Sequence, residues 1–311
     1  MIVSMIIPAY NAERFILRAL QSLVDQNVEN SEIIVVDNNS TDATVLMINE
    51  FMSSCSCPVK VISEKIQGEA AARNAGLAAA TGKFIQYLDA DDYLLPGKVD
   101  QHIRMAEKEE LDFVIGGSIQ KYTTGERWQR IPDTDPWKGL ASGMFGDSNS
   151  NFYLKEVLTD IGGFDERIAI GTDIDLYFRL LAATDKVFVD TEPRSVYVHH
   201  DGERASDSNM ISEYTRRVLN CYRIIKYLQK EEAEYYLENR SYFNAFAIKN
   251  LRFLATYDLE ESLRLSRELY PNGIKKDDVA RDVLPLFSLL YPYFGFEFIE
   301  RLRLSVKEFL P

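Results

Sequence analysis

Apolar runs and helical periodicities alternate along the first 115 residues. Short runs rich in β-branched residues, typical of buried strands, occupy Ile2–Ile7, Glu32–Val36, Val59–Ile62, Phe84–Leu88 and Asp112–Ile115. Residues 12–26, 41–52 and 68–81 lie between these runs and carry apolar side chains at the spacing of an amphipathic helix. This repetition predicts an α/β domain built on a largely parallel sheet.

The second half of the chain is less regular. Residues 116–152 are rich in Gly, Ser, Asp and Thr and predict one long loop of functional or mobile character. Helices are predicted over 155–161 and 173–183, with strands over 186–190 and 195–198. Helical periodicity with many Tyr, Leu and Arg residues then predicts a helical C-terminal subdomain over residues 207–311, after an α/β domain over 1–206.

The net charge and the cysteine content limit which partners and which cellular compartment the sequence favours. The chain has 35 Lys+Arg against 48 Asp+Glu, a formal net charge of −13, which argues against a nucleic-acid partner. A bound metal would still allow a small anionic ligand. Cys55, Cys57 and Cys221 match neither a disulfide framework nor a zinc pattern, so we expect free thiols in a reducing compartment. Without a signal peptide or an apolar stretch of ~20 residues, a soluble or peripheral protein is expected.

Polar clusters follow three of the predicted strands. They contain Asn11, the run Asp37-Asn38-Asn39, and the run Asp89-Ala90-Asp91-Asp92. Ligands of parallel α/β sheets bind outside the carboxyl ends of the strands, so these clusters are expected to converge on one binding site.

Each cluster also has a purely structural interpretation. Asp89 and Asp91 suit Mg²⁺ or Mn²⁺, or else they cap a solvated turn. Asp37 marks either a ligand contact or an Asx turn. Arg73 is either a surface ion-pair partner or a fixed cation beside a diphosphate. Neither a G-x-G-x-x-G loop nor a P-loop is present, which disfavours dinucleotide oxidoreductases and P-loop enzymes.

Taken together, the clusters and other short motifs resemble those of a known family. The ordered blocks are Pro8-Ala9-Tyr10-Asn11, Val35–Asp42, Ala72-Arg73-Asn74-Ala75-Gly76, Leu88–Asp92, and Gly162-Gly163-Phe164-Asp165-Glu166 followed by Asp173-Ile174-Asp175-Leu176. Over about residues 2–206 the chain strongly resembles the family 2 glycosyltransferases of GT-A fold. Five blocks in order are far more specific than any one of them.

The resemblance implies a nucleotide-sugar donor, usually a UDP-sugar, and a divalent metal, Mn²⁺ or Mg²⁺. By motif position, donor binding falls to Pro8, Ala9, Tyr10, Asn11, Asp37, Asn39, Arg73, Asp89 and Ala90. Among these, Asp37 is expected at the uracil, Asp89 near the ribose and Arg73 at the nucleotide. Asp91 is implied as a metal ligand. Residues 1–115 would form the nucleotide-sugar side of the domain and residues 116–206 the acceptor side.

The resemblance also implies an inverting displacement with a carboxylate base, which falls on Asp173. Thr172 stands where the family usually has Glu. Any role of that Glu side chain in orienting the base would therefore be lost or altered here. A helix N-cap at Asp173 is the structural alternative. Tyr197-Val198-His199-His200 matches a family pattern except at Val198, and we favour His200 over His199 as a diphosphate or metal contact.

Several features leave alternatives open. Trp128 and Trp137 suit either a sugar face or core packing. The segment Ile299–Leu310 suits either a packed helix or a membrane-surface helix serving a lipid-linked acceptor. We expect cytoplasmic assembly of a surface glycan, at the inner face of the cell membrane if the C-terminal helices contact lipid, and a homo-oligomer is compatible with those helices. A non-catalytic nucleotide-sugar binder and a sugar nucleotidyltransferase are the alternative functions.

Overall fold

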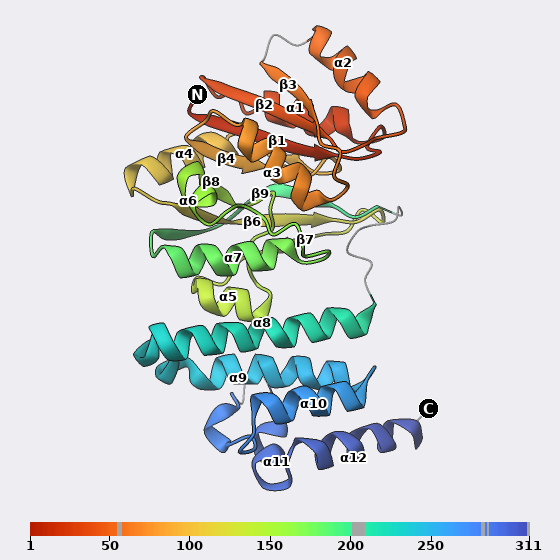
Figure 1. The fold of residues 1–311 in the computed structure, drawn as a ribbon, viewed down its shortest axis with the longest axis vertical. Coiled ribbons are helices and arrows are strands. Elements are labelled where there is room, and N and C mark those ends of the chain that lie inside the picture. The colour runs from red at the N-terminus through yellow and green to blue at the C-terminus, as the bar shows by residue number, and fades with distance from the viewer. Residues whose placement is uncertain (55–57, 201–208, 281–283, 285, 310–311) are drawn as a thin grey trace. The chain divides into compact units, whose positions relative to one another are not determined.

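The computed structural model describes residues 1–54, 58–200, 209–280, 284 and 286–309, in two compact units, Met1–Gly202 and Glu203–Pro311 (Figure 1). The first unit holds a mixed sheet flanked by helices. The described part of the second unit consists of helices and their connections. The predicted α/β fold with a helical C-terminal region is thereby confirmed.

Four parallel strands form one half of the sheet, in the order β3-β2-β1-β4. They are β1 (Val3–Ala9), β2 (Ser31–Asp37), β3 (Val59–Ser63) and β4 (Phe84–Tyr87). Helices cover both faces of this half, which explains the uninterrupted apolar runs of β1 and β2. Ala9 is the register partner of Asp37, so β1 and β2 end together and their following polar residues share one sheet edge.

Beyond β4 the sheet is mixed. β8 (Phe152–Leu154) pairs antiparallel with β4 and with β6 (Phe113–Lys121), and β6 runs parallel to β9 (Val187–Val198). The short strands β5 (Tyr93–Leu94) and β7 (Arg127–Arg130) pair antiparallel with β9 and β6. The uninterrupted parallel pairing therefore ends at β4, and beyond it β6 and β9 pair in parallel while β8, β5 and β7 pair antiparallel.

Alternate residues of the central strands face two different helical layers. Met5 and Ile7 share a core with α1 (Ile16–Val24), α2 (Thr44–Ser54) and α4 (Lys98–Lys108). The helix α3 (Glu69–Ala79) lies against Ile6 and Val36 instead. A Cβ at Gly76 would come within 2.3 Å of an Ile6 methyl group, so glycine is what lets α3 approach the strands.

The long loop predicted over residues 116–152 is wrong. β6 continues through Gly116 and Gly117, β7 follows, and α5 (Pro136–Ser142) forms before β8. A Cβ at Gly116 would lie 2.3 Å from the Ser150 carbonyl oxygen, and the β6–β9 register shifts at Gly117. Glycine marks close backbone approach in sheets as well as loops, so composition alone was ambiguous.

The two strands predicted over 186–190 and 195–198 form one strand, β9. Pro193 lies within it, opposite the register shift at Gly117, where a strand tolerates proline. The helices predicted on either side of the Gly-Gly-Phe block, α6 (Lys155–Asp160) and α7 (Thr172–Ala183), are present with ends shifted by one residue.

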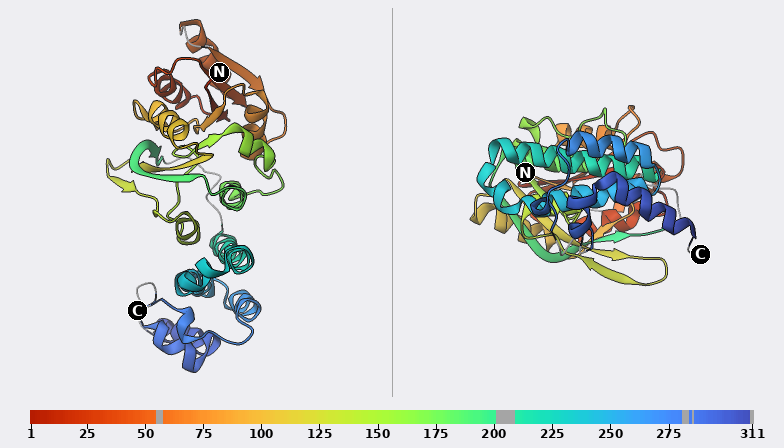
Figure 2. Two further views of the ribbon diagram at one scale, coloured as in Figure 1. Left: turned by 90° about the vertical axis from the view of Figure 1, so that its left-hand side faces the viewer. Right: turned by 90° about the horizontal axis from the view of Figure 1, so that it is seen from below.

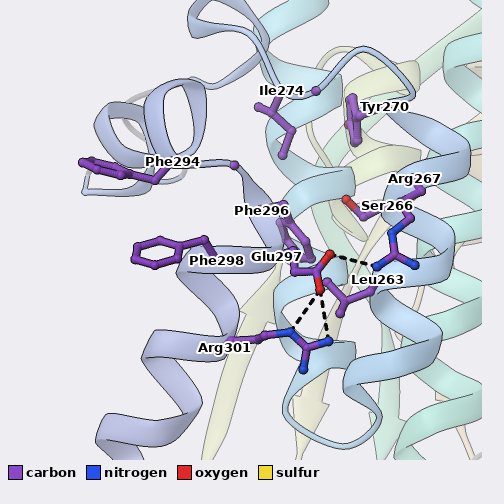
Figure 3. Close-up of a pocket in the computed structure, with 12 residues that line it drawn as sticks. Leu263, Ser266, Arg267, Tyr270, Ile274, Phe294, Phe296, Glu297, Phe298 and Arg301 are labelled. Atoms are coloured by element: carbon purple, nitrogen blue, oxygen red, sulfur yellow. Dashed lines mark hydrogen bonds and ion pairs between the residues drawn. The ribbon is translucent and has the colours of Figure 1, made fainter.

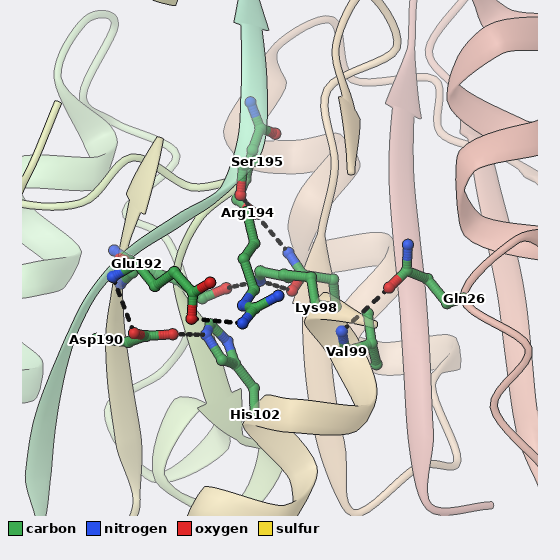
Figure 4. A network of polar contacts seen from close by, with 12 residues as sticks. Gln26, Lys98, Val99, His102, Asp190, Glu192, Arg194 and Ser195 are labelled. Atoms are coloured by element: carbon green, nitrogen blue, oxygen red, sulfur yellow. Dashed lines mark hydrogen bonds and ion pairs between the residues drawn. The ribbon is translucent and has the colours of Figure 1, made fainter. Parts of the chain in front are cut away.

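A buried polar network joins α4 to β9 (Figure 4). Lys98 is 1% exposed and donates to Gln86, and His102 Nε2 lies 3.2 Å from Asp190 Oδ2. Burial lowers the pKa of Lys98 to about 7 and the pKa of His102 to about 4. Folding therefore disfavours the protonated form of both side chains.

The second unit is built from α8 (Met210–Glu231), α9 (Ala233–Ala255), α10 (Leu259–Leu269), the 3₁₀ turn Lys276–Asp278, α11 (Phe287–Phe294) and α12 (Phe296–Phe309). α9 packs against both α8 and α10 (Figure 2). Glu300 of α12 is fully buried and accepts hydrogen bonds from Arg252 (3.3 Å) and Arg303 (2.7 Å). One face of α12 is thus packed within the unit.

The described residues include one of the three cysteines, Cys221. Cys221 is a buried thiol whose Sγ accepts from Asn250 Nδ2 at 3.7 Å, and burial raises its pKa to about 12. Cys55 and Cys57 lie outside the described residues. Among the residues that the structure describes, no helix is both long enough and apolar enough to cross a bilayer.

Candidate functional site

The ends of β1 and β2 carry the first group of predicted donor-binding residues. Pro8 and Ala9 close β1, and Tyr10, 54% exposed, follows at the sheet edge. The Asn38 N–H donates to the Ala9 carbonyl at 2.8 Å, which joins the two strand ends. Asp37 closes β2, and its Oδ1 accepts from the Ser40 N–H, three residues on, at 3.1 Å. The Asp37 side chain therefore supports the loop, but through a bond one residue longer than that of the Asx turn considered for it.

Two asparagines hold these loops in their shape. Asn11 and Asn39 have φ angles of 47° and 66°, in the left-handed region that asparagine tolerates. The Asn11 Oδ1 accepts from the Thr41 N–H at 2.8 Å, and the Asn39 Nδ2 donates to the Lys65 carbonyl at 3.0 Å. Both side chains therefore already serve the loop structure beside Tyr10 and Asp37.

Arg73 links α3 to the end of β4. Its Nη2 donates to Asp89 Oδ1 at 2.7 Å and also pairs with Glu69, one helical turn earlier. Burial disfavours the charge of Arg73, but Glu69 and Asp89 raise its pKa above the ordinary value. The surface ion pair considered for Arg73 is thus not what forms: the guanidinium is buried, and it is a fixed cation at the strand edge.

The Gly-Gly-Phe-Asp-Glu block packs against the same helix. The Asn74 side chain accepts from the Phe164 N–H at 2.8 Å and donates to the Phe164 carbonyl at 2.9 Å. The Phe164 ring lies 5.1 Å from the Arg73 guanidinium carbon. A Cβ at Gly163 would come within 2.5 Å of Asn74 Oδ1, so glycine is required there. The Gly-Gly-Phe-Asp-Glu block therefore packs against the Arg73 side chain through Phe164.

Asp91 lies beside His200. The Asp91 Oδ2 is 2.8 Å from His200 Nε2, and Phe15 stacks on the imidazole with ring centroids 4.7 Å apart. Arg18 donates to the Asp91 carbonyl. Ala90, 8% exposed, is buried between the two aspartates, so Asp89 faces Arg73 while Asp91 faces His200.

The second histidine of the pair takes a different direction. His199 Nε2 lies 2.9 Å from Gln120 Oε1, and the imidazole stacks on Tyr122 with centroids 4.0 Å apart. Trp128, 47% exposed on β7, donates to the Tyr122 hydroxyl at 3.2 Å, whereas Trp137 packs edge-on against Phe178. The structure therefore brings His200, and not His199, to Asp91.

Asp173 belongs to the same electrostatic environment. It is the second residue of α7, whose N-cap is Gly171, so the N-cap position considered for Asp173 is wrong. Attraction by Arg73 lowers the pKa of Glu69, but burial and the charges of Asp89, Asp173 and Asp91 raise it overall. Four carboxylates thus act on one another around Arg73.

Asp92 lies directly beneath this edge. Its Oδ1 accepts from the Val198 N–H at 2.8 Å, and its Oδ2 accepts from Asn149 Nδ2 at 2.5 Å. Burial, followed by the charges of Asp91 and Asp89, raises the pKa of Asp92 well above its usual range, and the Val198 hydrogen bond opposes the shift. Asn149 also accepts from the Asp89 N–H at 2.7 Å.

The donor chemistry fits a divalent cation bound with a phosphate substrate. The Asp91 carboxylate and the His200 imidazole are two suitable ligands, which leaves coordination positions for diphosphate oxygens and water. Within the described ranges no group of three His, Cys, Asp or Glu side chains is arranged to hold an ion. Among those residues, Asp91 and His200 are the two donors that lie together at this edge.

Sequence reasoning missed Glu69, Asp92 and Asn149 as contributors. Glu69 was detectable, because it lies four residues before Arg73 on a predicted helix, the spacing of an ion pair. Asp92 was named only as a member of the polar run Asp89-Ala90-Asp91-Asp92, with no role of its own. Asn149 lies 60 residues from Asp89 within the segment predicted as a loop, and no sequence signal points to it.

Relatives of known sequence match part of the chain. UDP-Glc:alpha-D-GlcNAc-diphosphoundecaprenol beta-1,3-glucosyltransferase WfgD of Escherichia coli is 37% identical over 116 residues, covering 37% of this chain and 45% of that protein. Succinoglycan biosynthesis protein ExoO of Rhizobium meliloti is 30% identical over 215 residues, covering 64% of this chain and 60% of that protein. The chain thus spans less than two thirds of the length of either relative.

Solved structures share the fold. The S. aureus TarS 1-349 complex with UDP-GlcNAc aligns over 99% of this chain and 92% of that chain, with a TM-score of 0.66 and 17% identity. Mannosyltransferase PcManGT from Pyrobaculum calidifontis, in complex with GDP-Man and Mn²⁺, aligns over 99% of this chain and 86% of that chain, with a TM-score of 0.53 and 17% identity. At such identities the likeness concerns the fold alone.

The family model described as Glycosyl transferase family 2 matches residues 4–164, more than half of the chain. The matched range contains the strand ends that carry Asp37, Asp89 and Asp91, and the helix α3 that carries Arg73. With the GT-A-like sheet and the ordered motifs at its carboxyl edge, the chain belongs to the family 2 glycosyl transferases.

Proposed function

We propose that this chain transfers a sugar from a UDP-sugar to a hydroxyl group of a growing surface glycan or a lipid-linked acceptor, with inversion at the anomeric carbon. The arrangement of Asp91, His200 and the Arg73–Asp89 ion pair at one strand edge carries the proposal. It combines a cation-binding pair with a fixed positive charge, which is what a diphosphate leaving group needs.

The donor would lie across the ends of β1, β2 and β4. Tyr10 offers an exposed ring for the uracil and Asp37 an acceptor for its N–H, while Asp89 and Ala90 would lie at the ribose. The remaining donor-binding positions of the proposal are Pro8, Ala9, Asn11, Asn39 and Arg73. The complexes with UDP-GlcNAc and GDP-Man show that proteins of similar fold bind nucleotide sugars, which makes the donor class plausible here.

Asp91 and His200 would hold a divalent cation, Mn²⁺ or Mg²⁺. When bound, such an ion supplies Lewis-acid stabilisation to the departing diphosphate. Arg73 adds a positive charge that needs no reorganisation, because its position is set by burial and by Glu69 and Asp89.

Asp173 would act as the general base. The acceptor oxygen attacks the anomeric carbon, the bond from that carbon to the diphosphate oxygen breaks, and UDP leaves with the electron pair. The acceptor hydroxyl proton passes to the Asp173 carboxylate. The Asp173 Oδ1 accepts from the Ile174 N–H at 2.9 Å, which helps to orient the carboxylate at the start of α7.

Thr172 precedes Asp173 and is 8% exposed. It cannot supply the charge of the usual family Glu, which keeps a non-catalytic nucleotide-sugar binder as the second candidate. A sugar nucleotidyltransferase is less favoured, because Pro8-Ala9-Tyr10-Asn11 lacks the Gly-rich basic loop that such enzymes use for a triphosphate.

The C-terminal helices would contact the membrane where the acceptor is lipid-linked. Phe298, Leu302 and Val306 form a half-exposed apolar stripe along α12, and Phe298 stacks on Phe294 with ring centroids 6.0 Å apart. Figure 3 shows both rings on the side away from the ion pairs of Glu297. Phe294 and Phe298 also line a pocket of about 470 Å³. The WfgD name specifies a diphosphoundecaprenol acceptor, which supports this choice. A cytoplasmic setting and a homo-oligomer remain predictions.

Release of nucleoside diphosphate from a panel of UDP- and GDP-sugars, with and without Mn²⁺, tests the proposal. We expect metal-dependent UDP release that falls by at least about 10²-fold in Asp173→Asn. Asp175→Asn is the matched control, because Asp175 lies on the same helical turn but pairs with Arg179. Release equal in both variants would remove Asp173 from its role, and UDP binding without any sugar cleavage would favour the non-catalytic binder.

A further inference from the structure

Asp92 and Asn149 form a buried pair under the strand edge that carries Asp89, Asp91 and His200. We propose that this pair, called the clamp below, positions Asp91 against His200 for binding of the donor diphosphate. It would do so because the donor and acceptor of each of its hydrogen bonds are fixed. Neither side chain would touch the substrate, so both are positioning residues. The inference rests on the proposed function, because the diphosphate is the group that the clamped edge would bind.

The clamp ties together three distant parts of the chain. Asp92 belongs to the turn after β4, Val198 ends β9, and Asn149 precedes β8. The Asp92 carboxylate accepts from the Val198 N–H and from Asn149 Nδ2, and Asn149 Oδ1 accepts from the Asp89 N–H. The turn that holds Asp91 and the strand end that leads to His200 are therefore held by the same two side chains.

Burial makes these hydrogen bonds costly to lose. Asp92 and Asn149 are each 1% exposed, so neither can replace a lost partner with bulk water. The Asn149 main chain is also fixed, because its carbonyl accepts from Gln86 Nε2 at 2.9 Å and from Ser195 Oγ at 3.1 Å. Asn149 thus has a rigid base from which its side chain reaches the turn.

The direction of each hydrogen bond is determined by Asp92. Both of its oxygens face N–H donors, so Asn149 must present its amide nitrogen to Asp92. Its amide oxygen then points to the Asp89 N–H, as observed. Changing either residue alone places two donors or two acceptors face to face, whereas exchanging the two residues restores every donor–acceptor pair and leaves the net charge unchanged.

The exchange supplies the test. Asp92→Asn and Asn149→Asp are each expected to weaken UDP binding in Mn²⁺ by at least about tenfold, to raise the Mn²⁺ concentration for half-maximal activity, and to lower kcat/KM by on the order of 10²-fold, since small misplacements have such effects. In the double variant D92N/N149D, the side chain at 92 accepts from Val198 and donates to the carboxylate at 149. We expect UDP affinity and kcat/KM to recover to within about fivefold of wild type.

A control separates positioning from loss of stability. Asn151→Asp makes the same chemical change two residues away, at a side chain that is fully buried and accepts from the Gly116 N–H at 3.1 Å. We expect a lower Tm with UDP affinity and KM within about threefold of wild type. If a single clamp variant does not fold, Asn149→Ala and the double variant carry the comparison.

The outcomes distinguish the two proposals. If wild type binds no UDP in Mn²⁺, the proposed function fails and the positioning role fails with it. If wild type binds UDP and the single variants bind it equally well, the positioning role alone is overturned. A double variant no better than the product of the two single defects also overturns it, because the paired polarity would then not matter.

Discussion

Asp91 Oδ2 lies 2.8 Å from His200 Nε2, although 109 residues separate the two side chains in sequence. Asp91 comes from the turn after β4, and His200 follows the end of β9. The contact therefore joins the end of β4, which lies within the residues that the family model matches, to the end of β9, which lies beyond them. It also defines the pair of donors on which metal binding would depend.

We expect His200→Ala to raise the Mn²⁺ concentration for half-maximal UDP binding by about 10-fold to 100-fold, since it removes one of the two metal ligands that we propose. Titration calorimetry with Mn²⁺ and UDP measures this shift. His199→Ala is the matched control, because His199 contacts Gln120 and Tyr122 instead. Equal effects of the two variants would contradict the assignment of His200.

Arg73→Met is expected to lower the free energy of unfolding by about 1–3 kcal/mol and to weaken UDP binding. The change leaves the carboxylates of Glu69 and Asp89 without their shared cation, but both are partly exposed, so the loss is smaller than for a fully buried pair. Urea unfolding and UDP titration measure the two effects. Arg104→Met, at an exposed ion pair of α4, should change stability by less than about 0.5 kcal/mol.

The buried network of α4 predicts a pH dependence of stability. The pKa of Lys98 is lowered to about 7, so between pH 7 and its unfolded value near 10.5 the unfolded chain binds a proton that the folded chain does not. Stability should therefore rise with pH across this window, with a slope of up to about 1.4 kcal/mol per pH unit from this group. Lys98→Met should remove this part of the slope in urea unfolding, whereas Lys186→Met, at an exposed site, should leave it.

His102 adds the same sign at lower pH. Its pKa is lowered to about 4, so stability should also rise from about pH 4 to pH 6.5, where the unfolded imidazole loses its proton. Unfolding curves for His102→Gln should show a flatter dependence in this window. An unchanged slope in that variant would mean that the folded protein accommodates the imidazolium.

The apolar stripe of α12 predicts lipid binding. Wild type should sediment with phosphatidylglycerol–phosphatidylethanolamine vesicles, and the double variant Phe298→Ser, Leu302→Ser should bind at least about tenfold more weakly, because it removes exposed apolar area from one face of the helix. Leu237→Ser is the matched control, since Leu237 is 66% exposed on α9. Vesicle binding that is absent in wild type would leave this face without a membrane role.

The α/β core was predictable from local pattern. Apolar runs such as Ile2–Ile7 are buried on both faces, so periodicity and composition suffice to mark β1 to β4. The carboxyl-edge rule for parallel strands then predicts Asp37 and Asp91 on one edge of the sheet. The predicted loop over 116–152 failed because Gly116 and Gly117 satisfy close packing in a sheet, which local composition does not distinguish from a turn.

The sequence by itself determined the alternation of strands and helices from β1 to β4, the family and the residue types available for a nucleotide-sugar site. Only the tertiary structure decided that His200 rather than His199 meets Asp91, that Arg73 is shared by Glu69 and Asp89, and that Asn149 supports the turn. The physical reason is separation along the chain: propensity and periodicity are local, whereas these contacts join side chains from different strands and depend on register, burial and the direction of each hydrogen bond.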